Sequence, residues 1–217
     1  MRVYVSRLPA RSDMRRCSPV PSYRLDPYPV VILAAGAGRR MGTIKSRIEW
    51  RGRSLLEDAI ARARQVSREV HVMSGAGYPF DRFRTRIQPS RWWFVPDWRQ
   101  GQSRSLRAAL VGPGSRAKGV LVMLVDQPLV PVSHLQSLMA KVRAQPTEPI
   151  ASEAEGVTMA PAWLPRRIWP ELASLRGDQG AGRVLRQLGV ETLSCPEAGQ
   201  DLDTPAQLLR ARQIRFD

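Results

Sequence analysis

Short apolar runs alternate along this chain with segments in which apolar residues recur at helical spacing. The runs have the length and the shortage of polar side chains expected of buried parallel strands. We expect these strands at residues 30–34, 70–73, 92–95 and 120–125. Ser54 opens a helical segment, and Glu57 completes the S-x-x-E pattern of a capping box. The alternation predicts an α/β fold with a mostly parallel sheet and right-handed crossovers.

The second half of the chain continues the same pattern. Strands are expected at residues 149–152, 157–160 and 190–194, and helices at 103–110, 133–142 and 181–188. Ser133 is the expected cap of its helix, and Thr204 with Pro205 forms the N-cap and first turn of a last helix. In such sheets ligands bind beyond the carboxyl ends of the strands. We therefore expect the binding site in the loops that follow residues 34, 95 and 125.

Residues 1–28 lack a clear hydrophobic period. They hold four prolines, and six arginines against Asp13 and Asp26 give them a net charge of +4. The segment has neither a convincing amphipathic helix nor the apolar core of a secretory signal. We expect a disordered basic extension at 1–28, followed by a single domain at 29–217.

Composition bounds the class of protein. A hydrophobic content of 43% suits one compact domain. The net charge of +15 favours phosphates, nucleic acid or anionic lipid, but the arginines are scattered and no basic stretch is interleaved with aromatic residues. We therefore do not expect nucleic acid as a partner. The two cysteines lack metal-ligand spacing and no apolar run approaches a membrane span, so we expect a cytoplasmic protein.

The loop after the first strand reads LAAGAGRRMGTIK, from Leu33 to Lys45. Glycines after a buried strand let backbone N–H groups approach phosphate oxygens, and Arg40 and Lys45 add positive charge. No Gly-Lys pair of a P-loop occurs, and a dinucleotide-binding fingerprint that starts at Gly36 meets Met41 where it needs glycine. The loop suits a triphosphate, although glycine turns after strands also occur without a ligand.

Carboxylates follow the most apolar strand and precede the last helix. Asp126 stands at the end of the run 120–125, where it could hold Mg²⁺ bridged to triphosphate oxygens or simply turn the chain before Pro128. Asp203, in the segment Asp201-Leu202-Asp203, is either a second metal ligand or an ordinary turn residue. In the loop after residue 95, Ser103 or Ser105 either caps a helix or contacts a ligand.

These motifs, in this order, resemble the MobA-like nucleotidyltransferases, and the closest branch is similar to the molybdenum cofactor cytidylyltransferases. The resemblance covers about residues 30–209. It rests on LAAGxxxRMGxxK at 33–45, DQP at 126–128, GDxGA at 177–181 and DxDTP at 201–205. It implies a three-layer Rossmann-like fold of the nucleotide-diphospho-sugar transferase type.

The resemblance also implies the site and its ligands. Mg²⁺ would be held by Asp126 and Asp203, and Lys45, Arg40 and Asp126 would serve catalysis. The nucleotide would be held by Leu33, Ala34, Ala35, Gly36, Gly38, Arg40, Lys45, Gly101 and Ser105. Because LAAG is typical of family members that use CTP, Ala35 favours CTP over GTP. Molybdopterin would be the acceptor, and a molybdoenzyme that receives the product would be a further partner.

Other functions stay open. The chain departs from the family pattern at Val95, Gln102, Gly182 and residues 156–159, and the last two departures fall on the acceptor side. The enzyme could therefore use GTP, or act on another phosphorylated acceptor. The protein could also deliver a cofactor to a molybdoenzyme without catalysis. A nucleic-acid binder rests on the net charge of +15 alone.

Overall fold

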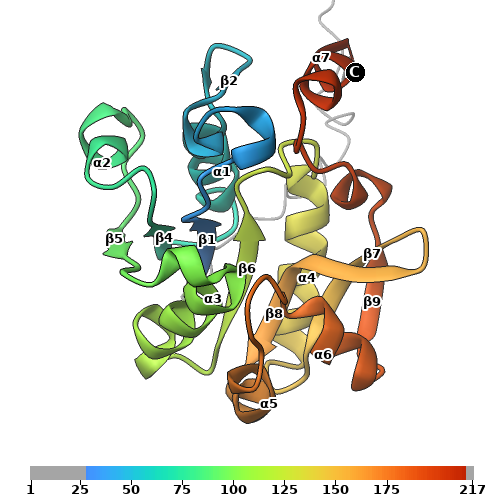
Figure 1. Cartoon of the computed structure of the whole chain (residues 1–217). Helices are drawn as coiled ribbons and strands as arrows, with labels where there is room; N and C mark the ends of the chain where they lie inside the picture. The colour runs from blue at the N-terminus through green and yellow to red at the C-terminus, as the bar shows by residue number, and fades with distance from the viewer. Residues whose placement is uncertain (1–27, 214–217) are drawn as a thin grey trace, which may run out of the picture.

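The computed structural model describes residues 28–213 and contains a seven-stranded sheet with helices on both faces (Figure 1). The strand order is β5-β4-β1-β6-β8-β7-β9. The strands are β1 (Val30–Ala34), β4 (Val70–Ser74), β5 (Arg91–Phe94), β6 (Gly119–Leu124), β7 (Ile150–Ala154), β8 (Val157–Pro165) and β9 (Glu191–Ser194). Only β8 runs antiparallel to its neighbours, so the predicted mostly parallel α/β fold is confirmed.

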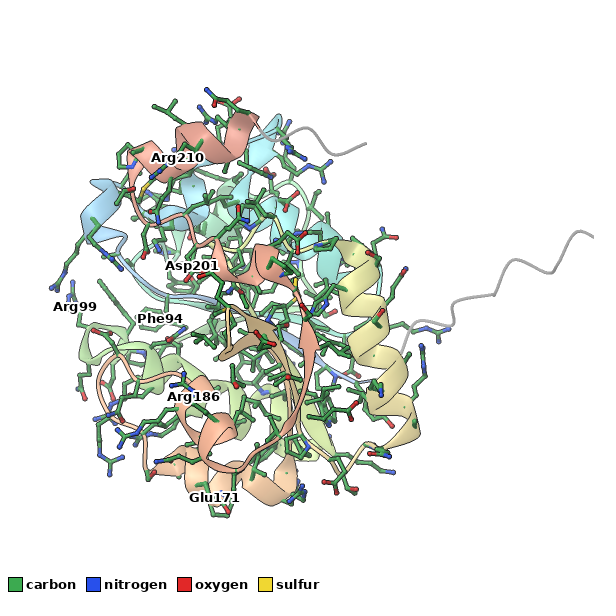
Figure 2. The ribbon with its side chains drawn as sticks, turned by 90° about the vertical axis from the view of Figure 1, so that its right-hand side faces the viewer. Phe94, Arg99, Glu171, Arg186, Asp201 and Arg210 are labelled. Atoms are coloured by element: carbon green, nitrogen blue, oxygen red, sulfur yellow. The ribbon has the colours of Figure 1, made fainter. Side chains whose placement is uncertain are left out.

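Two apolar cores, one on each face of the sheet, join the sheet to its two helical layers. Along β1, Ile32 packs into the core that includes α1 and α4, whereas Val31 and Leu33 pack into the core of α3, α5 and α6. The helices are α1 (Leu55–Ala63), α2 (Phe80–Arg84), α3 (Gln102–Val111), α4 (Val132–Ala144), α5 (Trp169–Ala173), α6 (Gly182–Gln187) and α7 (Pro205–Gln213). Figure 2 places Arg210 of α7 and Glu171 of α5 at opposite ends of the molecule.

The predicted helix starts have mixed outcomes. The capping box at α1 is confirmed, because the Ser54 side chain accepts from the Glu57 N–H while the Glu57 carboxylate accepts from the Ser54 N–H. Thr204 also accepts from the N–H of Gln207 at the start of α7. The prediction for Ser133 is wrong. Pro131, extended at φ −74°, already occupies the N-cap of α4, so Ser133 falls inside the first turn.

Some elements were not predicted from the sequence. The short helices α2 and α5 and the hairpin of β2 (Glu49–Trp50) and β3 (Arg53–Ser54) are too short to give a clear hydrophobic period. The predicted extension lies outside the described residues except for Tyr28, whose ring packs edge-on against Trp163. Within residues 28–213, every helix is too short or too polar to cross a membrane.

Candidate active site

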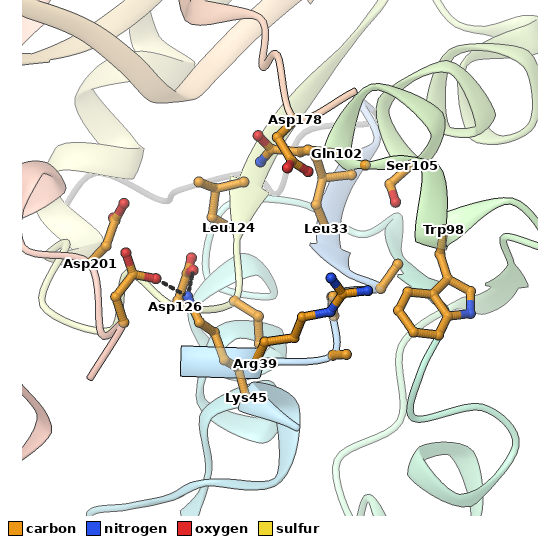
Figure 3. A pocket seen from close by; sticks show the side chains of 18 of the residues that line it. Leu33, Arg39, Lys45, Trp98, Gln102, Ser105, Leu124, Asp126, Asp178 and Asp201 are labelled. Carbon is orange, nitrogen blue, oxygen red and sulfur yellow. Dashed lines mark hydrogen bonds and ion pairs between the residues drawn. The ribbon is translucent and has the colours of Figure 1, made fainter. Parts of the chain in front are cut away.

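A cleft of about 490 Å³ opens at the carboxyl ends of β1 and β6. It lies between the loop after β1, the start of α3 and the segment before α7 (Figure 3). Every residue that the sequence assigned to the site lines this cleft: Leu33, Ala34, Ala35, Gly36, Gly38, Arg40, Lys45, Gly101, Ser105, Asp126 and Asp203. The loops after residues 34, 95 and 125 are distant in sequence but line the same cleft, as the sequence pattern predicted.

The glycine loop turns sharply after β1. Gly38 adopts φ +62°, and a Cβ there would lie 2.1 Å from the Thr43 carbonyl oxygen, so only glycine fits. Gly36 differs, because the space around it is open. Gly38 thus closes the loop onto residues 43–45, while Gly36 leaves room for a ligand beside the backbone.

Two cations of this loop contact two carboxylates. The Nζ atom of Lys45 lies 2.5 Å from Asp126 Oδ2 and 2.5 Å from Asp203 Oδ1. A guanidinium nitrogen of Arg40 lies 2.8 Å from Asp203 Oδ2. Burial lowers the pKa of Lys45, but attraction and hydrogen bonds from Asp126 and Asp203 outweigh it and leave the pKa raised above 10.5. Lys45 is therefore a permanent cation at neutral pH.

Asp201 is a third carboxylate in the cleft that the sequence did not assign. The Leu202 N–H donates to the Asp126 carbonyl oxygen at 2.9 Å, which ties residues 201–203 to the end of β6. Burial, with the charges of Asp126 and Asp203, raises the pKa of Asp201 to about 6. The alternation of Asp201, buried Leu202 and Asp203 is the signal that could have found it, because alternate residues of an extended segment share a face.

The loop between β5 and α3 forms the opposite wall of the cleft. Gly101, at φ +103°, packs against Gly177, and neither Ser103 nor Ser105 caps α3, so that alternative is wrong. Ser105 and Gln102 line the cleft beside Trp98. Sequence reasoning also missed the cleft residues Ala37, Arg39, Trp98, Arg99, Gln102, Leu124, Val125 and Asp178.

A second pocket of about 230 Å³ continues from the cleft and shares Leu33, Gln102 and Leu124 with it. Its wall includes Arg183 and Arg186 of α6 and residues 158–160 of β8. Of the family departures, Thr158, Met159 and Gly182 therefore fall at this pocket. A Cβ at Gly182 would lie 2.4 Å from the Thr158 carbonyl oxygen, so glycine there lets α6 pack against β8.

The carboxylates suit a divalent cation only together with phosphates. Among residues 28–213, no group of three or more His, Cys, Asp or Glu side chains could hold a metal ion by itself. Asp126 and Asp203 nevertheless hold a positive charge between them, the ammonium of Lys45. Mg²⁺ commonly takes one or two carboxylates and completes its coordination with water and substrate phosphates, so the pair fits such an ion.

The two histidines lie outside the cleft lining. His71 belongs to β4, where burial and then the charge of Arg91 lower its pKa to about 4. His134 belongs to α4, bonds Ser152 at 2.8 Å, and also has a pKa lowered by burial. Both imidazoles are neutral near pH 7, and because both lie outside the cleft lining, neither provides a cation or a base there.

Comparisons with known proteins show the family to which the chain is similar. The MobA-like NTP transferase domain matches residues 30–192. The nicotine blue oxidoreductase of Paenarthrobacter nicotinovorans is 33% identical, and the purine catabolism protein PucB of Bacillus subtilis is 30% identical. Each match covers 83% of this chain and 94% of the relative.

Two further matches extend the comparison. The molybdenum cofactor guanylyltransferase of Pseudomonas syringae is 30% identical over 58% of this chain and 61% of its own length. Rv0371c of Mycobacterium tuberculosis, solved in complex with manganese, superimposes with a TM-score of 0.72 and 25% identity. That match covers 88% of this chain and 100% of the other.

Proposed function

We propose that this chain, which belongs to the MobA-like NTP transferase family, transfers CMP from CTP to a molybdopterin cofactor and releases pyrophosphate. The observation that carries the proposal is the contact of Lys45, from the glycine loop, with Asp126, at the end of β6. A loop suited to phosphates and a carboxylate suited to Mg²⁺ meet within the reach of one triphosphate.

The reaction is an in-line displacement at phosphorus. An oxygen of the acceptor phosphate forms a bond to the α-phosphorus of CTP, and the bond from that phosphorus to the bridging oxygen breaks. The bridging oxygen keeps the electron pair and leaves as part of pyrophosphate. The acceptor phosphate is already ionised near neutral pH, so the reaction needs no side-chain base. This fits a cleft whose lining contains no histidine.

The chain's own groups position the triphosphate and stabilise its charge. The space beside Gly36 is open, so the backbone there would leave room for phosphate oxygens. The cations of Arg40 and Lys45 would bind the phosphates that leave as pyrophosphate. Asp126 and Asp203 would hold Mg²⁺. When bound, the metal ion neutralises phosphate charge and orients the departing group.

The two ends of the cleft suit the two substrates. Ser105, Gln102 and Trp98 line the wall where the resemblance places the nucleotide base, and Ala35 favours CTP. The contiguous second pocket carries Arg183 and Arg186, which suit an anionic acceptor. The guanylyltransferase relative keeps GTP as the alternative donor.

A second candidate is a cofactor-delivery protein that binds the nucleotide-bearing cofactor without catalysis. The departures on the acceptor side favour it, because Thr158, Met159 and Gly182 line the second pocket. The names of the nicotine blue and purine catabolism relatives do not mention molybdopterin, so another phosphorylated acceptor stays an alternative for the transfer reaction.

Pyrophosphate release across the four ribonucleoside triphosphates, with and without molybdopterin, tests the proposal. We expect release that needs CTP, Mg²⁺ and molybdopterin together and that disappears in Asp126→Asn. Preference for GTP would correct the donor alone. Tight binding of the nucleotide and of molybdopterin without any pyrophosphate release would reject catalysis and support the delivery function.

A further inference from the structure

We propose that Arg40, Lys45, Asp126 and Asp203 form a charge bridge that makes triphosphate and divalent-cation binding depend on each other. The inference rests on the proposed function, because it concerns the same two ligands. In the free protein each ligand's binding groups are held by the groups that would bind the other. Neither ligand alone can free its own groups without leaving charges unpaired.

The contacts of Lys45 block the place of a metal ion. Its ammonium lies 2.5 Å from one oxygen of Asp126 and 2.5 Å from one oxygen of Asp203. Only 17% of the Lys45 side chain is exposed, so the ammonium is not a loosely held surface charge. A divalent cation that approached these carboxylates alone would meet a like charge at close range.

Asp203 holds both cations of the loop. Its Oδ1 contacts Lys45 and its Oδ2 contacts Arg40 at 2.8 Å, so both of its oxygens are engaged. Arg40 is 73% exposed, and its pair with Asp203 is correspondingly weaker than the pair of Lys45. Lys45 is therefore the main link of the bridge.

A triphosphate that arrived without a metal ion would meet the opposite obstacle. Asp126, Asp201 and Asp203 all line the cleft, and the cations that should bind phosphate are already neutralised by two of them. Drawing Lys45 toward phosphate would leave Asp126 without the partner it has in the free protein. Burial makes an unpaired charge costly, so the triphosphate alone gains little.

When both ligands arrive, the ion pairs exchange. Lys45 and Arg40 then bind the phosphates, and the two carboxylates bind the divalent cation. Every charge then keeps a partner of opposite sign. Such coupling is reciprocal, so each ligand raises the affinity for the other by the same factor.

Any triphosphate binds divalent cations in water, and this attraction by itself couples the two ligands. The contribution of the charge bridge must therefore be measured with each ligand alone. Replacing Lys45 should raise the affinity for the metal ion, and replacing Asp203 should raise the affinity for the triphosphate. Matched controls remove a like charge from the same cleft. Arg39 and Asp178 both line it, and neither forms an ion pair with a described residue.

The first experiment titrates the free protein with Mn²⁺ and no nucleotide, with bound Mn²⁺ counted by electron paramagnetic resonance. We expect Lys45→Met and Lys45→Gln to bind Mn²⁺ about tenfold more tightly than the wild type, a typical coupling between sites. Arg39→Met should change the affinity by no more than about twofold. Unchanged or weaker Mn²⁺ binding in both Lys45 variants, or an equal gain in Arg39→Met, would overturn the bridge.

The second experiment titrates inorganic tripolyphosphate in the presence of EDTA, so that the choice of base does not matter. We expect Asp203→Asn to bind it at least about fivefold more tightly than the wild type, and Asp178→Asn to show a smaller gain. A gain in Asp178→Asn as large as that in Asp203→Asn would reject the bridge. Neither titration involves an acceptor or turnover. Failure to release pyrophosphate therefore rejects the transfer reaction alone, whereas absent affinity gains reject the bridge alone.

Discussion

The Lys45 ammonium lies 2.5 Å from a carboxylate oxygen of Asp126, although the two residues are 81 positions apart in the sequence. Neighbouring parallel strands bring them together, because β1 pairs with β6 and Leu33 lies opposite Leu124. The loop that follows one strand and the carboxylate that ends the other therefore emerge at the same edge of the sheet. This relationship makes a single triphosphate–metal site geometrically possible.

Asp126→Asn should abolish metal-dependent turnover without unfolding the protein. The change removes one carboxylate charge but keeps the shape of the side chain. Loss of this charge from a metal site should lower kcat by at least about a hundredfold. Pyrophosphate release measures the effect, and circular dichroism checks the fold. Asp97→Asn, an exposed residue outside the cleft lining, is the control and should keep nearly full activity. Wild-type turnover in Asp126→Asn would reject the assignment of Asp126.

Asp201→Asn should stabilise the protein at pH 7. The folded-state pKa of Asp201 is raised from 3.8 to about 6, mainly by burial. The folded state thus holds more protons between these values, and stability is lost as the pH rises through about 6. The Gln127 side chain lies beside Asp201, and each ends in an oxygen that lacks a donor among the described residues. The amide of an asparagine at position 201 would supply an N–H donor for the Gln127 oxygen.

Urea denaturation at pH 4 and pH 7 tests the predicted gain in stability of Asp201→Asn. The free energy of unfolding of Asp201→Asn should exceed that of the wild type by on the order of 1–3 kcal/mol at pH 7. The difference should shrink toward zero at pH 4, where the wild-type carboxyl is protonated. A variant that is less stable than the wild type at pH 7 would show that Asp201 is needed as a carboxylate for folding.

The sequence predicted most of the sheet because buried strands need nearly continuous apolar runs, as at 120–125. It also placed the glycine loop and Asp126, since their positions depend on local turns at strand ends. It did not predict the partners of Lys45. The Lys45–Asp203 contact spans 158 positions and depends on how the last segment folds back across the sheet.

Trp98 shows the same limit on the opposite wall. A tryptophan in a loop can serve many roles, and no local pattern distinguishes a cleft residue. Its place depends on Gly75, just after β4, where a Cβ would lie 2.6 Å from the Trp98 ring. The contact joins two loops that neither propensity nor spacing relates, so only the folded chain reveals it.

Ser54→Ala should destabilise the protein by about 1 kcal/mol. Ser54 accepts from the Glu57 N–H at 3.1 Å and completes a reciprocal pair at the start of α1. Its loss leaves a helix N–H without that partner. Thermal unfolding measures the change, with Ser137→Ala on α4 as the control, because Ser137 is exposed and bonds only the carbonyl of Ser133 among the described residues. Equal stability losses in the two variants would contradict the capping role.

His71 should make the protein less stable in acid. Burial, with the charge of Arg91, lowers its folded-state pKa from 6.5 to about 4. The unfolded state therefore binds more protons between these values, and stability is lost as the pH falls from 6.5 to 4. Trp93 donates to His71 Nδ1 at 3.2 Å, an acceptor that protonation would remove.

The comparison with His71→Gln isolates this contribution. Between pH 7 and pH 4 the wild type should lose on the order of 2–3 kcal/mol more unfolding free energy than the variant, whose side chain does not titrate. Urea denaturation across this range provides the measurement. Parallel pH profiles for the two proteins would show that His71 titrates normally.

Pulsed electron paramagnetic resonance of Mn²⁺ with a non-hydrolysable CTP analogue, in excess protein, tests the convergence of loop and carboxylates most directly. We predict a protein-bound Mn²⁺ that shows hyperfine coupling to ³¹P of the analogue in the wild type and reverts to the spectrum of Mn²⁺–nucleotide in solution in Asp126→Asn. Protein-bound Mn²⁺ without ³¹P coupling, or a protein-bound Mn²⁺–nucleotide spectrum that persists in Asp126→Asn, would contradict a shared triphosphate–metal site.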